Sequence, residues 1–356
     1  MVNLKKIADK LKDKYKNTTI VSEDDGLVDF VSTGNLAFDL ISDGGIPFGV
    51  MTEFIGFSQS GKSLYCQTIL ANAQRDYGAI GLYIDREGAL TDKRAKELGV
   101  DTSNVIKAPP ESVPTAVDAF SFVIESILDI RKQDKDIYIV AVIDSIAAFD
   151  KDVDLEKADV GRKAKSIKEG LRALFTHIDK KVMVLIVNHF YYNVGVVFGT
   201  PKQASGGEGL RYFNTLRIAL EDKRKITDPA RGNEVIGSWI GIEVIKTRLG
   251  PCYRTCYVPF YYTTGVLRLG GYMRLLVDRG YVKPKNKKEF LGFRQVMVKY
   301  NDKEFNEYDI EKFIETYPSL LFDHYPEYNQ GDKDANEDGE GPIVEPVGEE
   351  DNSYTE

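Results

Sequence analysis

The sequence contains only three cysteines in 356 residues. Cys252 and Cys256 lie in a strand-like stretch, where four residues span about 13 Å, too far for a disulfide bond or a shared metal ion. We therefore expect no disulfide framework, and a reducing cytoplasm is the expected compartment.

Long hydrophobic runs are also missing. The longest, residues 137–143 and 182–187, have the length of buried strands, whereas a membrane-spanning helix needs roughly 20 apolar residues. The N-terminus is rich in lysine but lacks the apolar segment of a secretory signal. Both absences argue against a membrane or secreted protein.

An excess of positive charge, which would suggest a nucleic-acid partner, is absent as well, because the net charge is −8. Residues 331–356 hold ten acidic residues and one lysine, hence −9, which leaves +1 for residues 1–330. The acidity therefore belongs to a tail that we expect to be disordered, and it does not exclude a polyanionic partner for the nearly neutral body.

A short amphipathic helix is expected at the N-terminus. Leu4, Ile7, Leu11 and Tyr15 recur at helical spacing among six lysines, and a polar linker follows at 17–26. A helix separated from the core in this way must bury its apolar stripe on its own body or on a neighbouring subunit.

Strand-like and helical runs alternate from residue 31 to residue 265. We expect strands at 52–56, 80–85, 137–144, 182–188, 215–220, 239–246 and 255–261, and helices at 63–76, 91–98, 114–132 and 162–179. This alternation predicts an α/β fold with a mostly parallel central sheet and antiparallel additions at its end. Ligands of such sheets bind at the carboxyl ends of the strands.

The chain divides into four expected parts. These are an N-terminal oligomerisation helix and linker (1–30), a core (31–265), a small C-terminal domain (266–330) and the acidic tail (331–356). The C-terminal part begins with a lysine-rich stretch and is expected to carry a helix at 307–316.

The most specific motif is a phosphate-binding loop with the pattern G-x-x-x-x-G-K-S, between an apolar strand and a helical run. Its residues are Gly56, Phe57, Ser58, Gln59, Ser60, Gly61, Lys62 and Ser63. Backbone N–H groups of such a loop wrap the phosphates, while Lys62 reaches the β and γ oxygens and Ser63 binds Mg²⁺. The motif therefore predicts ATP and Mg²⁺ as ligands.

Carboxylates stand at or just after the ends of two further strands. The apolar run 137–144 ends in Asp144, followed by Ser145, and an acid at this position can hold Mg²⁺ through water. Asp85 ends the strand 80–85, and Glu87 follows it closely. Either could polarise the water that attacks the γ-phosphate, so by chemistry alone the two compete for this role.

Several segments resemble the bacterial RecA and phage UvsX recombinases. Residues 32–36 together with 44–49 are similar to the run before their P-loop, and residues 83–90 to their catalytic-glutamate segment. Residues 194–201, followed by the Gly206-Gly207 pair, resemble their second DNA-binding loop, which other P-loop ATPases lack.

The resemblance implies roles for individual residues of the nucleotide site. Glu87 then becomes the water-activating base in preference to Asp85, and Asp144 becomes the acid that binds Mg²⁺, with Ser145 beside it. Arg94 occupies the place of an aromatic residue that stacks on adenine, and a guanidinium plane can stack there too.

Three more positions gain a role from the same resemblance. Lys246 and Arg248 match two basic residues that reach the γ-phosphate held by the adjacent subunit. His189 takes the place of a glutamine that senses the γ-phosphate and orders the loop after it, and the UvsX branch also carries histidine there.

Two DNA-binding segments are implied as well. Residues 190–207 show neither a strand nor a helix pattern, and the positions that match DNA contacts in them are Tyr191, Val194, Gly206 and Gly207. The acidic segment 150–161 matches the first DNA loop. The helix after it supplies the expected phosphate-binding cations, which are Arg162, Lys165 and Arg172.

The implied protein is an ATP-dependent DNA recombinase with a RecA-like P-loop ATPase core. It would form helical filaments on single-stranded DNA, pair this DNA with homologous duplex and exchange strands, in the cytoplasm of a bacterium or of the host of a phage. Single-strand-binding and loader proteins are the expected further partners, and no membrane is involved.

Two other classes remain as alternatives. A RecA-core hexameric helicase or motor would bring a substantial extra N-terminal or lid domain, whereas a helix on a linker fits a filament better. A non-catalytic P-loop scaffold would not need Lys62, Glu87 and Asp144 together.

Overall fold

The structure, a computed structural model, describes residues 4–12, 28–150, 160–192, 202–204, 207–293, 297–307 and 309–320. Contacts between residues divide the chain into two units, 1–310 and 311–356. The second unit holds most of α10 (Ile310–Thr316) and a short 3-10 helix, Pro318–Leu320.

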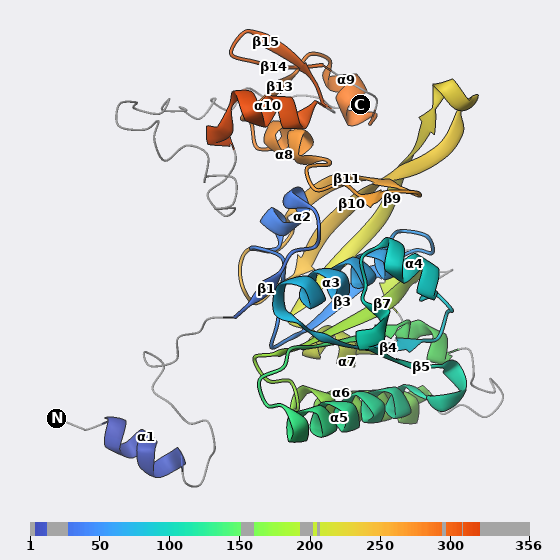
Figure 1. Ribbon diagram of the computed structural model, residues 1–356, viewed down its shortest axis with the longest axis vertical. Helices are drawn as coiled ribbons and strands as arrows, with labels where there is room; N and C mark the ends of the chain where they lie inside the picture. Colours follow the sequence, from blue (N-terminus) through green and yellow to red (C-terminus); the bar gives the residue numbers. More distant parts are fainter. Residues whose placement is uncertain are drawn as a thin grey trace. The chain divides into compact units, whose positions relative to one another are not determined.

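A large mixed sheet forms the centre of the first unit, in the strand order β12-β11-β10-β9-β3-β7-β6-β4-β5, with β8 paired to β7 (Figure 1). The parallel strands are β3 (Met51–Gly56), β4 (Ile80–Asp85), β5 (Val105–Ala108), β6 (Ile139–Asp144) and β7 (Val182–Tyr192). β9 (Leu216–Asp228) runs parallel to β3, and β10 (Glu234–Lys246), β11 (Thr255–Tyr261) and β12 (Gly265–Val266) follow antiparallel. The predicted α/β fold, mostly parallel with antiparallel additions, is confirmed.

Helices cover both faces of the parallel strands, which explains why the central strands β4 and β6 are almost wholly apolar up to their closing aspartates. The helices are α3 (Lys62–Tyr77), α4 (Asp92–Glu97), α5 (Ala116–Gln133), α6 (Val160–Phe175) and α7 (Gly207–Phe213). Gly81 of β4 faces α3, since a Cβ there would lie 3.1 Å from Leu70. The next residue, Leu82, points to the opposite face and packs with α5 and α6.

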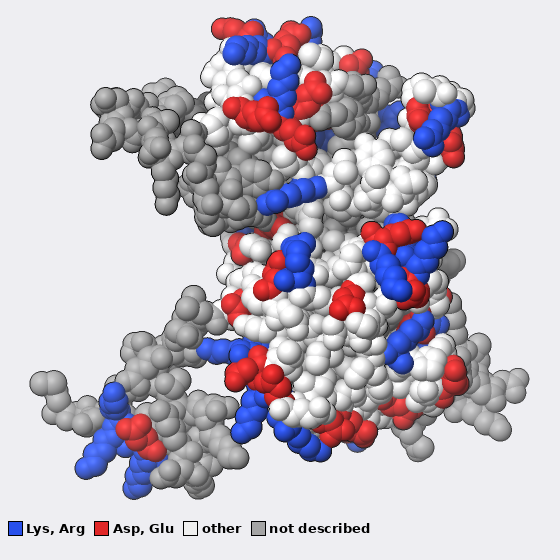
Figure 2. Space-filling view, viewed as in Figure 1, with Lys and Arg blue, Asp and Glu red and all other residues white. Residues whose placement is uncertain are grey.

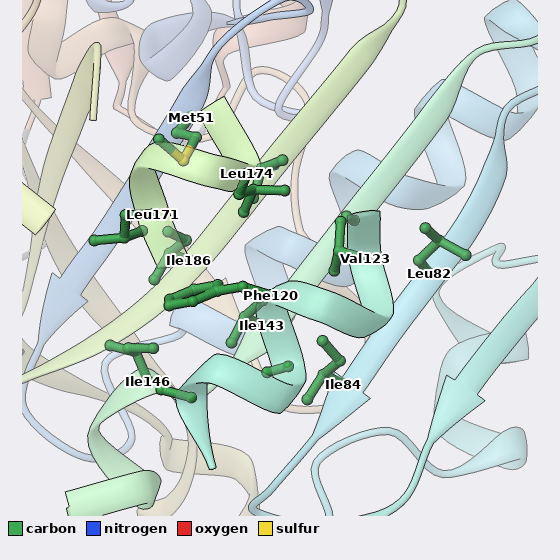
Figure 3. Close-up of a cluster of buried hydrophobic side chains, with 14 of the residues drawn as sticks. Met51, Leu82, Ile84, Phe120, Val123, Ile143, Ile146, Leu171, Leu174 and Ile186 are labelled. Atoms are coloured by element: carbon green, nitrogen blue, oxygen red, sulfur yellow. The ribbon is translucent and has the colours of Figure 1, made fainter. Parts of the chain in front are cut away.

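The core between the sheet and the pair α5–α6 is wholly apolar (Figure 3). Phe120 of α5 lies at its centre, and α6 approaches it closely at Gly170, where a Cβ would lie 2.5 Å from the ring. Replacing Phe120 with alanine would cost about 3–5 kcal/mol, the usual range for a buried phenylalanine. This core fixes the strands whose carboxyl ends carry the predicted site.

The first unit also contains smaller elements. They are α1 (Leu4–Lys12), β1 (Phe30–Val31), α2 (Leu36–Ile41), β2 (Ile46–Pro47), α8 (Tyr272–Asp278), α9 (Lys287–Leu291) and the antiparallel sheet β13 (Lys283–Pro284), β14 (Met297–Tyr300) and β15 (Lys303–Asn306). In α1, the described apolar side chains Ile7 and Leu11 are 47% and 39% exposed, so the predicted helix carries an exposed apolar stripe.

A buried arginine ties α8 to the strand β10. The guanidinium of Arg274 lies 4.6 Å from the ring of Trp239 and 4.5 Å from that of Phe290. Its charge is balanced by Glu307, at 3.0 Å, and both side chains are almost fully buried. Removing one partner of such a pair costs about 3–5 kcal/mol, because the other charge is left buried.

The element boundaries differ from the predicted ones in a few places. The stretch 190–207 is regular at both ends, because β7 continues to Tyr192, β8 (Lys202–Ala204) pairs with it, and α7 begins at Gly207. The expected absence of pattern from residue 190 onward was therefore wrong. The helices predicted at 162–179 and 307–316 lie at 160–175 and 310–316. The tail and the linker 17–26 lie outside the described residues.

Two further observations concern the cysteines and the hydrophobicity of the helices. All three cysteines are free thiols. Among the described residues, no helix combines the length and the hydrophobicity needed to cross a membrane.

Candidate functional site

The phosphate-binding loop connects β3 to α3 in a strained, open conformation. Gln59 and Gly61 have positive φ angles of 63° and 89°, and Gly56 has no room for a Cβ, which would lie 2.6 Å from Ser60 Oγ. These conformations turn the chain back on itself, so that α3 begins with its free N–H groups facing the loop. A loop built in this way is suited to binding an anion.

Lys62, the first residue of α3, points into the loop. Its ammonium donates to the Phe57 carbonyl at 2.7 Å and lies 3.5 Å from Ser60 Oγ. Burial lowers the pKa of Lys62 to about 8, although Asp144 and Glu87 act in the opposite direction. A partly desolvated ammonium gains strongly from a phosphate, because the anion stabilises the positive charge in place of the water that burial has removed.

The loop opens into a cavity of about 520 Å³. Four segments of the chain line it: Ser58, Gln59, Ser60, Gly61, Lys62, Ser63 and Leu64, then Glu87, then His189, and then Phe260 and Tyr262. The parallel strands β3, β4 and β7 thus meet here at their carboxyl ends, as expected for a ligand site in this class of sheet.

Asp144 ends β6 beside the loop and is completely buried. Burial raises the pKa of this carboxyl to about 6, while hydrogen bonds from Ser63 and Tyr83 act against the rise. The Tyr83 hydroxyl donates to Oδ2 at 3.0 Å, whereas Oδ1 is buried and accepts no hydrogen bond. A carboxylate oxygen left without a donor is an acceptor for water molecules of a hydrated cation.

The few protein oxygens beside the phosphate loop suit a Mg²⁺ ion that keeps part of its water shell. Among the described residues, no group of three or more His, Cys, Asp or Glu side chains could hold a metal ion unaided. Mg²⁺ commonly keeps several waters and takes one or two protein oxygens together with substrate phosphates. Ser63 and Asp144, which hydrogen-bond to each other, supply such oxygens beside the phosphate loop.

Glu87 stands in the turn after β4 and reaches the cavity. Its Oε1 atom accepts a hydrogen bond from Ser145 Oγ and lies 3.0 Å from His189 Nε2. The hydrogen bond with His189, helped by Ser145, lowers the pKa of Glu87 to about 2. The carboxylate is therefore ionised at neutral pH and can accept a hydrogen bond from an attacking water.

The other carboxylate of this turn, Asp85, is turned away from the cavity. It is buried, and its oxygens accept the backbone N–H groups of Ala89 and Leu90 at 2.8 and 3.2 Å. An ion pair with Lys107 at 2.7 Å completes its surroundings. The geometry thus favours Glu87 over Asp85 as the carboxylate that meets a ligand.

Arg94 does not line the cavity. Its guanidinium bonds to Glu97 of the same helix at 3.2 Å, an ordinary i,i+3 pair. Two aromatic residues that were not predicted, Phe260 and Tyr262, line the cavity instead, and their ring centres lie 5.8 Å apart. The aromatic run at the end of β11 was the available sequence signal, but nothing in the local sequence places it beside the loop.

Lys246 and Arg248 also lie away from the cavity of their own chain. The Lys246 ammonium donates to the carbonyls of Arg211 and Asn214, both at 2.6 Å, and Arg248 donates to Tyr212 at 3.0 Å. The two cations therefore hold the last carbonyl groups of α7, a favourable place for positive charge. Burial and the neighbouring Arg248 lower the pKa of Lys246.

The predicted DNA-binding residues are described only in part. Lys165 and Arg172 are exposed on α6, and Tyr191 is 46% exposed near the end of β7. Gly207 is the first residue of α7. The Arg162 side chain, Val194 and Gly206 lie outside the described residues. Positive and negative side chains alternate on the face shown in Figure 2, so no large patch of one sign is visible among its described residues.

Comparison with known proteins identifies the family. Residues 3–267 match the model of the RecA N-terminal domain. The chain is 33% identical to Protein RecA of Clostridioides difficile over 263 residues, which cover 72% of each chain. It is 32% identical to Protein RecA of Geobacter metallireducens over 259 residues, 71% of this chain and 72% of the relative.

A longer match is that to Protein RecA of Aquifex aeolicus, with 29% identity over 302 residues, 83% of this chain and 81% of the relative. The family match over residues 3–267 contains the phosphate loop, Glu87, Asp144, His189, Lys246 and Arg248. The chain belongs to the RecA family, as a RecA-type recombinase and DNA-dependent ATPase.

Proposed function

We propose that this chain binds ATP with Mg²⁺ in the cavity beside the phosphate loop and assembles on single-stranded DNA into a helical filament. The filament would pair its DNA with a homologous duplex and exchange the strands. The observation that carries the proposal is the convergence of Lys62, Glu87 and His189, from three separate elements, on one cavity.

The loop residues Gly56 to Ser63 would bind the phosphates, with Lys62 leaving the Phe57 carbonyl to contact the β and γ oxygens. Ser63 and Asp144 would hold Mg²⁺, which neutralises charge that develops on the phosphates. Glu87 would orient and polarise the attacking water, and Ser145 would keep its carboxylate in place. Phe260 and Tyr262 offer an apolar surface for the base, a role for which Arg94 has no support in its contacts.

His189 would report the state of the nucleotide to the DNA-binding strand. Its ring contacts Glu87 and lies on β7 just before Phe190 and Tyr191. A γ-phosphate would compete for this ring and change the path of the chain toward the segment that contains Val194 and Gly206. Tyr191 and Val194 would contact bases, and Gly206 and Gly207 would approach phosphates closely.

Lys246 and Arg248 would act on the nucleotide of the adjacent subunit. They lie outside their own cavity, and both end in cationic groups that bind only carbonyl oxygens among the contacts described. A γ-phosphate is a far better partner for these groups. Hydrolysis would then require a neighbouring subunit, which links it to assembly.

The remaining parts take supporting roles in this proposal. Residues 1–30 would link subunits through the exposed stripe of α1, and residues 31–265 form the ATPase and DNA-binding core. Residues 266–330 form a small C-terminal domain, and 331–356 an acidic tail.

Arg162, Lys165 and Arg172 of α6 would bind DNA phosphates. We place the protein in the cytoplasm, with single-strand-binding and loader proteins as further partners.

Electron microscopy with single-stranded DNA and a slowly hydrolysed ATP analogue tests assembly, and a strand-exchange assay tests the product. We expect helical filaments and exchange with homologous duplex only. Closed rings that unwind duplex without pairing would support the RecA-core motor instead. Assembly that needs nucleotide but shows no hydrolysis would support the scaffold.

A further inference from the structure

The turn that presents Glu87 is held by an ion pair buried at one end. Residues 86–90 connect β4 to the segment before α4, and Gly88 in their middle has a positive φ of 69°. Side-chain contacts hold the first part of the turn, where Arg86 donates to the Pro110 carbonyl at 2.8 Å and Glu87 contacts Ser145 and His189. The backbone at its far end, residues 89 and 90, is held by a different group.

Asp85 fixes the backbone at the end of the turn. Its side chain accepts the N–H groups of Ala89 and Leu90 at 2.8 and 3.2 Å, so one carboxylate closes the turn from residue 85 to residue 90. Only 1% of this side chain is exposed, and a buried carboxylate needs a counter-charge as well as hydrogen bonds.

Lys107 supplies that charge from the edge strand β5. Its ammonium lies 2.7 Å from Asp85 Oδ2 and also donates to the Leu90 carbonyl at 2.9 Å. The same side chain thus contacts the carboxylate that closes the turn and the residue at which the turn ends. Other contacts of the turn are the hydrogen bonds from Gln67 to the Ala89 carbonyl, from Arg86 N to the Asp144 carbonyl, and from the Arg86 guanidinium to the Pro110 carbonyl.

We propose that Asp85 and Lys107 are positioning residues for Glu87, which they hold in place through the turn 86–90. Neither lines the cavity, so neither acts on the ligand. The proposal rests on the proposed role of Glu87 in polarising water. It also gives Lys107 a function in hydrolysis, although its side chain is 41% exposed at the edge of the sheet.

The test compares Lys107→Met, Lys107→Arg and Lys96→Met in DNA-stimulated ATP hydrolysis. Lys96 is a matched control, because it forms an exposed pair with Asp92 at 2.8 Å and does not touch the turn. We expect Lys107→Met to lower kcat about 10-fold or more with little change in KM, since small misplacements of a reacting group cost this much. Lys107→Arg should recover most of kcat, and Lys96→Met should match the wild type.

Two further measurements distinguish a positioning role of Lys107 from a general loss of folded structure. Hydrogen exchange at the amides of Ala89 and Leu90 should become several-fold faster in Lys107→Met and should stay normal in Lys107→Arg. In a Glu87→Gln background, Lys107→Met should lower the residual rate no further, because residues that act through one group are not additive. If Lys107→Met fails to fold, Lys107→Gln removes the charge but keeps a donor and serves in its place.

An unchanged kcat in Lys107→Met, unchanged exchange at the two amides, or an equal loss in the Glu87→Gln background would overturn the proposal. Failure of the proposed function gives a different pattern. Glu87→Gln alone would then hydrolyse ATP normally, while exchange at Ala89 and Leu90 would still report whether Lys107 holds the turn.

Discussion

The Nε2 atom of His189 lies 3.0 Å from Oε1 of Glu87. This contact joins the turn after β4, which contains Glu87, to the strand β7, which contains His189. Beyond His189 the same strand continues through Phe190, whose ring centre lies 6.0 Å from that of Phe57 in the phosphate loop. The strand that leads to the predicted DNA-binding segment therefore contacts both the candidate base and the loop.

Replacing His189 should separate DNA binding from hydrolysis. A hydrogen bond to a charged group contributes about 1.5–3 kcal/mol, or roughly 10- to 100-fold in a rate. We expect His189→Ala to lose stimulation by single-stranded DNA by this factor while ATP binding persists. His189→Gln, which also donates a hydrogen bond, should keep most of the stimulation. Steady-state hydrolysis with and without DNA measures both, and equal stimulation in the two variants would rule out the coupling role.

The pH dependence of hydrolysis should differ between kcat/KM and kcat. In the free enzyme Asp144 must be ionised and Lys62 protonated, and their pKa values are about 6 and about 8. Protonation of Asp144 below pH 6 and deprotonation of Lys62 above pH 8 should therefore both lower kcat/KM, which reports the free enzyme.

By contrast, kcat should be flatter, since bound phosphate and cation stabilise both charges. Glu87 should add no acidic limb above pH 5, because its pKa is about 2. Initial rates at saturating Mg²⁺ and DNA across pH 5 to 9 provide the measurement. A kcat/KM that stays constant over this whole range would contradict the assigned charges.

Complementation between two inactive variants tests the action of Lys246 and Arg248 on a neighbour. The variant Lys246→Ala, Arg248→Ala keeps an intact phosphate loop, and Lys62→Ala keeps intact cations. Each alone should hydrolyse little ATP, and a mixture on DNA should regain part of the activity at the junctions where an intact loop meets intact cations. A mixture as inactive as its components would show that the cations act elsewhere.

The acidic tail should compete with DNA for cationic side chains. Residues 331–356 carry −9 against +1 for the rest of the chain, and a tethered segment acts at high effective concentration. Removing the tail should tighten binding of duplex DNA at low salt, and the difference should shrink as salt screens both contacts. Titrations across a salt series compare the two proteins, and superimposable curves at low salt would mean that the tail only keeps the protein in solution.

Much of this architecture was predictable from the sequence because it depends on local pattern. β4 and β11 begin and end where the apolar runs do, at 80–85 and 255–261. The phosphate loop was identified by its motif and Asp144 by its place at a strand end, whereas the resemblance to the recombinases chose Glu87 over Asp85. The hairpin β9–β10 is longer than predicted, because residues 221–225 are exposed and carry no apolar alternation.

What the sequence could not give are relationships set by packing. Phe260 and Tyr262 line the cavity although β10 and β9 separate β11 from β3 in the sheet, and no local sequence pattern marks them as neighbours of the phosphate loop. Likewise, Asp85 and Glu87 are chemically equivalent in the sequence. The burial of Asp85 and its contacts with Ala89 and Lys107 distinguish them.

Comparing ATP hydrolysis by the wild type and Glu87→Gln, with ATP and DNA binding measured on the same samples, tests the central claim most directly. The substitution keeps the shape of the side chain but removes the charge that polarises water. We predict hydrolysis that rises with single-stranded DNA in the wild type and falls about 10²- to 10⁴-fold in Glu87→Gln, with both ligands still bound. Near-normal turnover in Glu87→Gln would contradict the assignment of the site.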